Sequence, residues 1–328
     1  MFLSHRLPII FLLLIISSTA YVNYNEEEAK LFLNLAAAAY PANNASDMRE
    51  ECVKKTFPDD TFAVFAAITT PCDKRNNSCQ AFSSVSNKTR RIILSFRGTD
   101  GTSQLYQEMT HSLRDYPYYN ETDDKGNVGQ IGRVNKYFLT AMNVMWDVMV
   151  EPLLPLYPNY TFIVTGHSLG GAMAALAAFR LSYRKVVENP YDIRLITFGE
   201  PREGDYEYAQ IFQQYVPYSF RIVHYTDPVP HLPPLDELNI TLTGYPFHHT
   251  REIWYDNKFT SYTICNTTWG EDENCSDRKK FWSYGAKAMK EHLWYFNHYI
   301  SVYGWNGCNS SNIISNSTAF FLFLYFLF

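Results

Sequence analysis

The stretch from Thr161 to Gly171 reads TFIVTGHSLGG, and it decides the fold of this chain. An apolar, β-branched run ends in GHSLG, and a helical stretch of small residues, AMAALAAFRL, follows at once. This order predicts a strand, a tight turn and a helix, with Ser168 at the apex of the turn. Glycine is needed on both sides of the serine, at Gly166 and Gly170, to avoid clashes between strand and helix. We therefore predict that Ser168 is a nucleophile rather than a serine in an ordinary glycine-rich loop.

The composition describes a globular protein with a large core. The chain has 328 residues, of which 46% are hydrophobic and 16% aromatic, with a net charge of -5 at pH 7. This length allows one or two domains, but no internal repeat or long linker divides the chain. The mildly acidic balance argues against nucleic-acid partners and against a polybasic membrane anchor. We expect a single catalytic domain over residues 21–308.

Residues 1–20 are predicted to be a secretory signal peptide. A weakly basic start at His5 and Arg6 precedes the apolar run Leu7–Ile16, and the small residues Ser18-Thr19-Ala20 form a cleavage site. The apolar run is too short to span a bilayer. A high density of N-x-S/T sequons also suits an exported glycoprotein. The ten sequon asparagines are Asn44, Asn76, Asn87, Asn120, Asn159, Asn239, Asn266, Asn274, Asn309 and Asn316.

Six cysteines follow the predicted signal, and an even number in an oxidising compartment implies disulfides. Six cysteines allow 15 connectivities, but the spacing favours two local pairs, Cys72–Cys79 and Cys265–Cys275. The remaining pair, Cys52–Cys308, would then tie together the two ends of the domain. A zinc site is the rival interpretation, but the chain has no C-x-x-C pair and no H-E-x-x-H helix. We predict three disulfides and no metal.

Strands and helices alternate along the chain, which predicts a mostly parallel sheet covered on both faces. The run RIILSF is apolar throughout, as expected of a central strand. The segment Tyr116–Gly132 is polar and rich in glycine and proline, and we expect an exposed loop there. The predicted helices are Glu26–Tyr40, Asn135–Leu156 and Tyr206–Tyr215, and the predicted strands are Thr61–Thr70, Arg91–Phe96, Asp192–Phe198 and Phe220–Tyr225.

The C-terminal segment, residues 309–328, ends in the apolar run AFFLFLYFLF from Ala319 to Phe328. Ten residues are too few for a transmembrane helix. Small residues, a polar spacer and a hydrophobic tail match the outline of a GPI-attachment signal, with the attachment site between Asn309 and Ser311. A tail that packs nowhere explains the same composition, and the sequence leaves both interpretations open.

A nucleophilic serine needs a histidine that takes its proton and a carboxylate that orients the histidine. In sheets of this kind the three residues follow in the order Ser, Asp, His. Asp227 is the first suitable carboxylate, because it follows a predicted strand on a turn fixed by prolines. An ordinary turn-forming aspartate is the alternative. Three other aspartates are less well placed: Asp192, Asp205 and Asp236. Spacing does not show which histidine is the base, and the candidates after Asp227 are His231, His248, His249, His292 and His298.

Four motifs in a fixed order resemble the class 3 triacylglycerol lipase family, from about Glu26 to Cys308. They are GHSLGG, FGEPREGD at Phe198–Asp205, HYTDPVPHLPP at His224–Pro234 and EHLWYF at Glu291–Phe296. The best-known members of that family are secreted fungal lipases with an α/β-hydrolase fold. The resemblance implies that Ser168 is the nucleophile, Asp227 the orienting acid and His292 the general base. It also implies that His248 and His249 are not catalytic and pack beneath the site.

The loop after strand Arg91–Phe96 supplies an oxyanion donor in such folds. The resemblance assigns this role to Thr99, with the amide of Leu169 as the second donor; a simple strand-ending turn is the alternative. The next segment, Asp100–Asp115, carries apolar residues at helical spacing and matches a lid in the resembled lipases. It lacks the tryptophan that fungal lids often carry, and a simple packed helix explains the same pattern.

These observations predict a secreted serine ester hydrolase acting on acylglycerols at a lipid–water interface, without a cofactor or an obligate protein partner. The alternatives are a phospholipase or small-ester esterase with the same triad, and a non-catalytic lipase-like protein that binds lipid.

Overall fold

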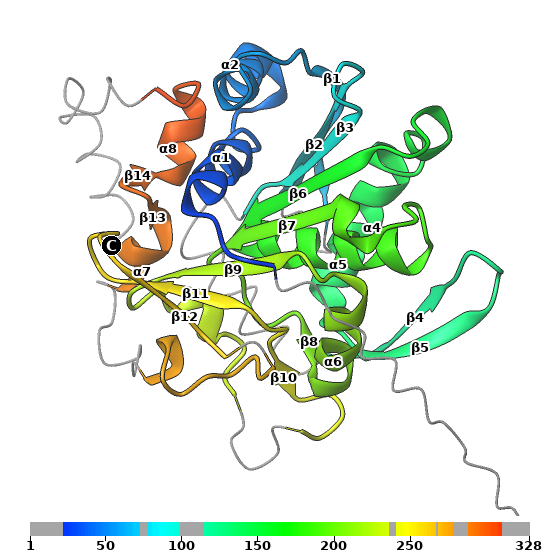
Figure 1. Ribbon diagram of the computed structural model, residues 1–328, viewed down its shortest axis with the longest axis vertical. Coiled ribbons are helices and arrows are strands. Elements are labelled where there is room, and N and C mark those ends of the chain that lie inside the picture. The colour runs from blue at the N-terminus through cyan, green and yellow to red at the C-terminus, as the bar shows by residue number, and fades with distance from the viewer. Residues whose placement is uncertain are drawn as a thin grey trace, which may run out of the picture.

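The computed structural model describes residues 22–72, 78–98, 115–235, 241–266, 268–278 and 288–309. Its main element is an eight-stranded sheet with the order β1-β2-β3-β6-β7-β9-β11-β12 (Figure 1). The five central strands, from β3 to β11, are parallel, and antiparallel strands complete both edges. The strands are β1 (Ala63–Pro71), β2 (Ser78–Ser86), β3 (Arg91–Phe96), β6 (Thr161–His167), β7 (Ile193–Phe198), β9 (Ser219–His224), β11 (Glu252–Tyr255) and β12 (Tyr262–Ile264).

Helices cover both faces of the sheet and bury a separate apolar cluster on each (Figure 1). Alternate side chains of β3 point to opposite faces, so Ile92 and Leu94 join one cluster and Ile93 joins the other. On the first face lie α4 (Lys136–Met149), α5 (Leu169–Tyr183) and α6 (Tyr206–Tyr215); on the second lie α1 (Glu26–Ala37), α2 (Ser46–Thr56) and α8 (Ile300–Trp305). This architecture confirms the predicted α/β fold.

Short elements complete the fold and connect the main layers. Asn25 and Asn135 cap α1 and α4, because each side-chain oxygen accepts a hydrogen bond from a backbone amide in the first turn. The remaining helices and strands are η1 (Asn43–Ala45), β4 (Tyr118–Thr122), β5 (Val128–Arg133), η2 (Leu154–Leu156), η3 (Pro190–Asp192), β8 (Gly204–Asp205), η4 (Val229–His231), β10 (Pro246–Phe247), η5 (Ser276–Arg278), α7 (Ala288–Leu293), β13 (Trp294–Tyr295) and β14 (His298–Tyr299).

Two sequence-based expectations differ from the structure. The predicted loop Tyr116–Gly132 is wrong, because its residues form the antiparallel hairpin β4–β5, which extends from the body of the molecule (Figure 1). Tyr119 and Ile131 of this hairpin are buried in the core and give it an apolar inner side. The second difference is β2, SCQAFSSVS, a polar sequence that we did not predict as a strand and that is almost fully buried.

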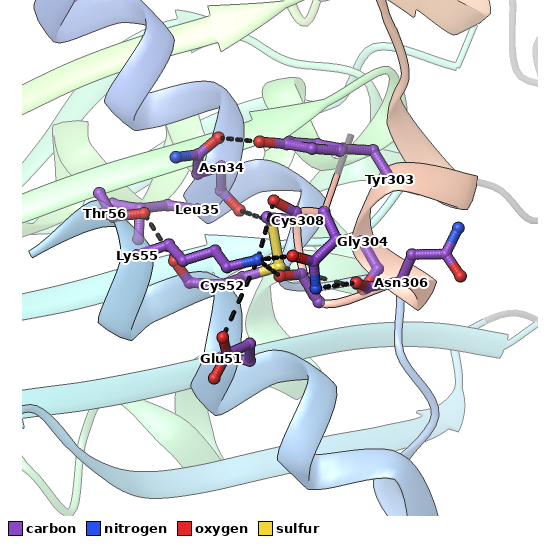
Figure 2. The surroundings of a disulfide bond; sticks show 12 residues. Asn34, Leu35, Glu51, Cys52, Lys55, Thr56, Tyr303, Gly304, Asn306 and Cys308 are labelled. Carbon is purple, nitrogen blue, oxygen red and sulfur yellow. Dashed lines mark hydrogen bonds and ion pairs between the residues drawn. A yellow bond between two sulfur atoms is a disulfide. The ribbon is translucent and has the colours of Figure 1, made fainter. Parts of the chain in front are cut away.

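Three disulfides are present, and they join the cysteines in the predicted pairs: Cys52–Cys308, Cys72–Cys79 and Cys265–Cys275. The first of these fastens α2 to the end of the described chain (Figure 2). Beside it, the Lys55 ammonium donates to the carbonyl oxygens of Gly307 and Cys308, at 3.1 and 3.3 Å. Covalent and polar contacts therefore hold the C-terminal end against the domain.

Several predicted features lie outside the described residues. They are the signal peptide, Thr99, the amphipathic segment up to residue 114, the tail beyond residue 309 and the sequons at Asn76, Asn239 and Asn316. None of the helices in the described part of the chain combines the length and the apolar character that a membrane span requires.

Candidate active site

Ser168 lies at the sharp turn between β6 and α5, in a backbone conformation that few residues with a side chain adopt, with φ +59° and ψ -132°. The turn leaves no room beside it for larger residues. A Cβ on Gly166 would lie 2.1 Å from the carbonyl oxygen of Gly170, and one on Gly170 would lie 2.1 Å from that of Phe96. The predicted steric role of both glycines is therefore visible in the geometry.

Asp227 and His292 meet at the carboxyl end of the parallel strands. His292 Nδ1 lies 2.9 Å from Asp227 Oδ2 and 3.0 Å from Oδ1. Asp227 follows β9, and His292 belongs to α7, so residues 65 positions apart form this pair. Because an ionised carboxylate only accepts hydrogen bonds, Nδ1 is protonated and Nε2 is left to accept a proton.

The Asp227 carboxylate is completely buried, yet it stays ionised. Burial alone would raise its pKa, but the charge of His292 and hydrogen bonds from His292, Tyr295 and the Val229 amide outweigh that effect and lower the pKa below its ordinary value. The Tyr295 hydroxyl donates to Oδ2 at 2.5 Å, and the Val229 amide donates to Oδ1 at 2.9 Å. An aspartate held in this way can orient an imidazole over the whole physiological pH range.

The predicted nucleophile, Ser168, and the predicted base, His292, are both buried in this structure. Ser168 is 2% exposed and His292 is 0% exposed. Within the described part of the chain, neither Ser168 Oγ nor His292 Nε2 has a hydrogen-bond partner. Such unpaired buried atoms are uncommon in folded proteins and mark a site where a substrate or a closer approach of the two groups would satisfy them.

The two predicted oxyanion donors can be followed only in part. Leu169 begins α5 directly after Ser168, so its amide lies in the first turn of the helix. Thr99 lies outside the described residues, but the preceding Gly98 packs tightly against the turn. A Cβ on Gly98 would lie 2.7 Å from the His167 carbonyl oxygen and 2.9 Å from Ser168 Cβ. The end of β3 therefore approaches Ser168 on the side where the loop containing Thr99 begins.

Sequence reasoning missed two residues of this site. One is Tyr295, whose hydroxyl contacts Asp227; its only signal was its place three residues after His292 in the motif EHLWYF. The other is Gly199, which has a φ of +58° and lies directly against the pair. A Cβ there would lie 2.7 Å from Asp227 Oδ2 and 2.8 Å from His292 Nδ1. A residue with any side chain at this position would push the pair apart.

His248 and His249 lie behind the site and not in it. His248 Nε2 donates to the Pro230 carbonyl oxygen at 2.7 Å. His249 Nε2 lies 3.0 Å from Glu200 Oε1, and its Nδ1 lies 3.2 Å from the Thr250 carbonyl oxygen. Both ring nitrogens of His249 therefore face oxygens of the protein and not the proposed site.

Two groups in the described residues have the donor atoms of a metal site. The group Glu252, Cys265 and Cys275 offers no thiolate, because its two cysteines form a disulfide. The other group is Glu200, Glu203 and His249. Burial first, and then the charge of Glu200, raise the pKa of Glu203 well above its usual range, so Glu203 holds a proton. The third member, His249, lies with Nε2 3.0 Å from Glu200 Oε1, so these two side chains already contact each other.

Comparisons with known proteins agree with one another. Residues 93–237 match the model of the class 3 lipases. A lipase of Caenorhabditis elegans is 33% identical over 314 residues, which cover 88% of this chain and 84% of that protein. A secreted mono- and diacylglycerol lipase of Fusarium solani is 40% identical over 99 residues, 30% of this chain and 26% of that protein. The solved structure of lipase II from Rhizopus niveus is 26% identical and superposes with a TM-score of 0.64, covering 83% of this chain and 94% of that one.

Proposed function

Because this chain belongs to the class 3 lipase family and is a carboxylic ester hydrolase, we propose that it is a secreted triacylglycerol lipase in which Ser168, Asp227 and His292 form the catalytic triad. The observation that supports these roles is the position of His292. Its Nδ1 is held by Asp227, while its Nε2 and the Ser168 hydroxyl are both buried and, in the described part of the chain, without a hydrogen-bond partner. A base and a nucleophile in this state are free to react with an ester that reaches them.

The reaction follows from these atoms. His292 Nε2 takes the proton of the Ser168 hydroxyl as Oγ attacks the ester carbonyl carbon. The negative charge on the carbonyl oxygen is held by the amide of Leu169 and by Thr99. His292 then returns the proton to the leaving alcohol as the ester bond breaks, which leaves the acyl group on Ser168. A water molecule, deprotonated by the same imidazole, releases the fatty acid and restores the serine.

Substrate reaches this site only after residues around it move. Ser168 is 2% exposed, and an ester cannot reach a hydroxyl that is so deeply covered. A movement that uncovers the triad at a lipid surface is the expected role of the amphipathic segment Asp100–Asp115. We therefore propose activation by a lipid–water interface, which a comparison of rates below and above substrate solubility would test.

Acylglycerols are the proposed substrates because the Fusarium relative is a mono- and diacylglycerol lipase. A panel of triacylglycerols, diacylglycerols, phospholipids and short soluble esters separates this proposal from a phospholipase or a small-ester esterase. Preference for a phospholipid by more than about tenfold in kcat/KM, or 1.4 kcal/mol, would replace the proposed substrate while leaving the mechanism in place.

Secretion is proposed from the signal-like residues 1–20 and from the three disulfides, which require an oxidising compartment. Whether the tail becomes a GPI anchor is tested on cells that express the full chain. Release of the enzyme from the cell surface by a phosphatidylinositol-specific phospholipase C would support the anchor. Peptides containing Phe320 to Phe328 in soluble, active enzyme would exclude it.

Labelling with a fluorophosphonate tests the triad and the enzyme class together. The wild-type protein should be labelled and Ser168→Ala should not. Ser168→Ala and His292→Ala should each lose roughly 10⁴-fold or more in kcat, and the double variant should be little worse than either single one. The control is His249→Gln, a buried histidine beside the site. If His249→Gln is inactive and His292→Ala remains active, the assignment of the base is wrong; if wild type is neither labelled nor active, a lipid-binding protein is the better interpretation.

A further inference from the structure

Two buried side chains that the mechanism does not use, Tyr40 and His167, lie behind the proposed base: His167 contacts His292, and Tyr40 contacts His167. Tyr40 follows the C-terminal end of α1, and His167 is the last residue of β6, immediately before Ser168. They are 4% and 1% exposed. The Tyr40 hydroxyl lies 2.6 Å from His167 Nδ1, and His167 Nε2 lies 2.7 Å from the backbone carbonyl oxygen of His292.

These partners define the protonation of the His167 ring. A carbonyl oxygen can only accept, so His167 Nε2 carries a hydrogen and donates it to His292. In a neutral ring Nδ1 then has a lone pair, to which the Tyr40 hydroxyl donates. Burial first, and then the charge of His292, lower the pKa of His167 to about 3, so the ring is neutral at neutral pH.

His167 also packs against the face of the base. The rings of His167 and His292 are stacked, with centroids 4.6 Å apart and planes inclined by 28°. On another side His167 meets the edge of Tyr295, the residue that holds Asp227. A neutral aromatic ring in this place can lie beside the imidazolium that forms on His292 during the reaction, whereas a second charged ring would repel it.

The backbone that carries His292 is held at two consecutive carbonyl groups. His167, from the end of β6, bonds the carbonyl of His292, and His224, from the end of β9, lies with Nδ1 3.0 Å from the carbonyl of Glu291. Both carbonyls belong to α7, described over Ala288–Leu293, so side chains from outside this helix hold its backbone at the proposed base. The ends of two central strands therefore set the position of the base relative to Ser168.

We propose that His167 is a positioning residue for His292, acting through its hydrogen bond to the His292 carbonyl and its stacked ring, and that Tyr40 fixes the His167 tautomer that makes this bond. The proposal rests on the triad proposed above. It extends the site by two residues that do not touch the substrate and that link α1 to the catalytic base.

The experiment compares His167→Gln, His167→Phe and Tyr40→Phe by steady-state kinetics on a soluble short-chain ester. His167→Phe keeps the stacked ring but loses the donor, and kcat should fall about 10- to 100-fold because the base is misplaced. His167→Gln keeps an N–H donor and should recover part of this loss. Tyr40→Phe removes one hydroxyl, and kcat should fall by roughly tenfold or less. KM should stay within about twofold in all three, since none of these side chains binds substrate.

A double variant and a matched control distinguish positioning from general loosening of the core. If Tyr40 acts through His167, Tyr40→Phe should cost little further activity in the His167→Phe background. The control is Tyr24→Phe, at the other end of α1, where a buried hydroxyl bonds that of Tyr255 at 2.8 Å. This variant should lose stability but keep the wild-type kcat.

Three results would overturn the proposal: an unchanged kcat in His167→Phe, additive losses in the double variant, or an equal loss of kcat in Tyr24→Phe. All three results are informative only if the wild-type enzyme is active and Ser168→Ala abolishes that activity. If that dependence on Ser168 is missing, the proposed triad fails instead, so the two failures are distinguishable.

Discussion

The turn around Ser168 places a steric demand on single residues. The carbonyl of Phe96, at the end of β3, occupies the space where a side chain on Gly170 would begin, 2.1 Å from a Cβ, whereas a Cβ on Gly171 would lie 3.1 Å from the Cβ and 3.4 Å from the Cα of Glu200. Two adjacent glycines in one helix turn therefore differ in what they tolerate. The first permits the close approach of strand and helix at Ser168, and at the second a Cβ would need its neighbour to move by only a few tenths of an ångström.

Gly170→Ala and Gly171→Ala form a matched pair that tests this difference. Gly170→Ala should lower the free energy of unfolding by about 1–3 kcal/mol or more and reduce activity, because backbone atoms must move. Gly171→Ala should cost less, since the nearest atom lies 3.1 Å from its Cβ, against 2.1 Å at Gly170. Thermal unfolding and ester hydrolysis of both secreted variants provide the measurement, and equal losses would contradict the steric argument.

The buried neutral state of His167 makes stability depend on pH. Its pKa is about 3 in the folded protein, below the ordinary value of 6.5, so the unfolded chain binds more protons between these values. Stability from this residue is complete above pH 6.5 and is lost as pH falls toward 3, at roughly 1.4 kcal/mol per pH unit. Urea unfolding between pH 7 and pH 4 should therefore show a shallower dependence for His167→Gln than for wild type. Parallel pH profiles would contradict this assignment.

At the scale of elements, the hairpin β4–β5 is fastened to α5 by one buried acid. Glu121 is 3% exposed, and its carboxylate oxygens lie 2.6 Å from Arg180 and 2.9 Å from Arg184. The same hairpin carries an exposed ion pair between Asp124 and Lys185, at 3.2 Å. If the buried contact is broken, Arg180, whose side chain is 8% exposed, loses its carboxylate partner, although Arg184 keeps Glu151 at 3.3 Å. The exposed pair of Asp124 and Lys185 is solvated by water in any case.

Glu121→Ala should therefore lower the free energy of unfolding by about 3–5 kcal/mol. Asp124→Ala should change it by less than about 1 kcal/mol. Chemical denaturation of the two variants measures the contrast. Similar values for both would mean that the hairpin contributes little to the stability of the domain.

Elements whose residues follow a regular pattern could be predicted from the sequence, and the others could not. The apolar run of β3 and the small residues of α5 each favour one structure locally, and Asp227 follows directly from its strand. In β2, by contrast, Ser83 and Ser84 are fully buried because neighbouring strands and helices cover them, which depends on the whole fold. His292 could not be chosen among five histidines by spacing, since its contact with Asp227 spans 65 positions; the family resemblance supplied it.

At the scale of the whole molecule, Cys52–Cys308 closes by far the longest loop, with a sequence separation of 256 against 7 for Cys72–Cys79. Long loops lose more chain entropy when they are closed, so replacing both cysteines of the long pair by alanine should cost roughly 2–5 kcal/mol. The same replacement at Cys72 and Cys79 should cost less. Thermal unfolding of the two double variants tests this order, and a larger loss for the short pair would point to native-state strain.

The position of that long disulfide also determines how the protein bears a mechanical load. Tension applied between residue 22 and the C-terminal segment would run through α1 and α2 to Cys52, cross the sulfur–sulfur bond and leave at Cys308. The sheet, Ser168 and Asp227 lie on the bypassed loop and would carry none of it. In an optical trap, reduction of the bond should add about 900 Å of extensible chain, since each residue contributes roughly 3.5 Å. Ser168, Asp227 and His292 would thus lie outside the covalent load path, whereas Tyr40 would lie on it.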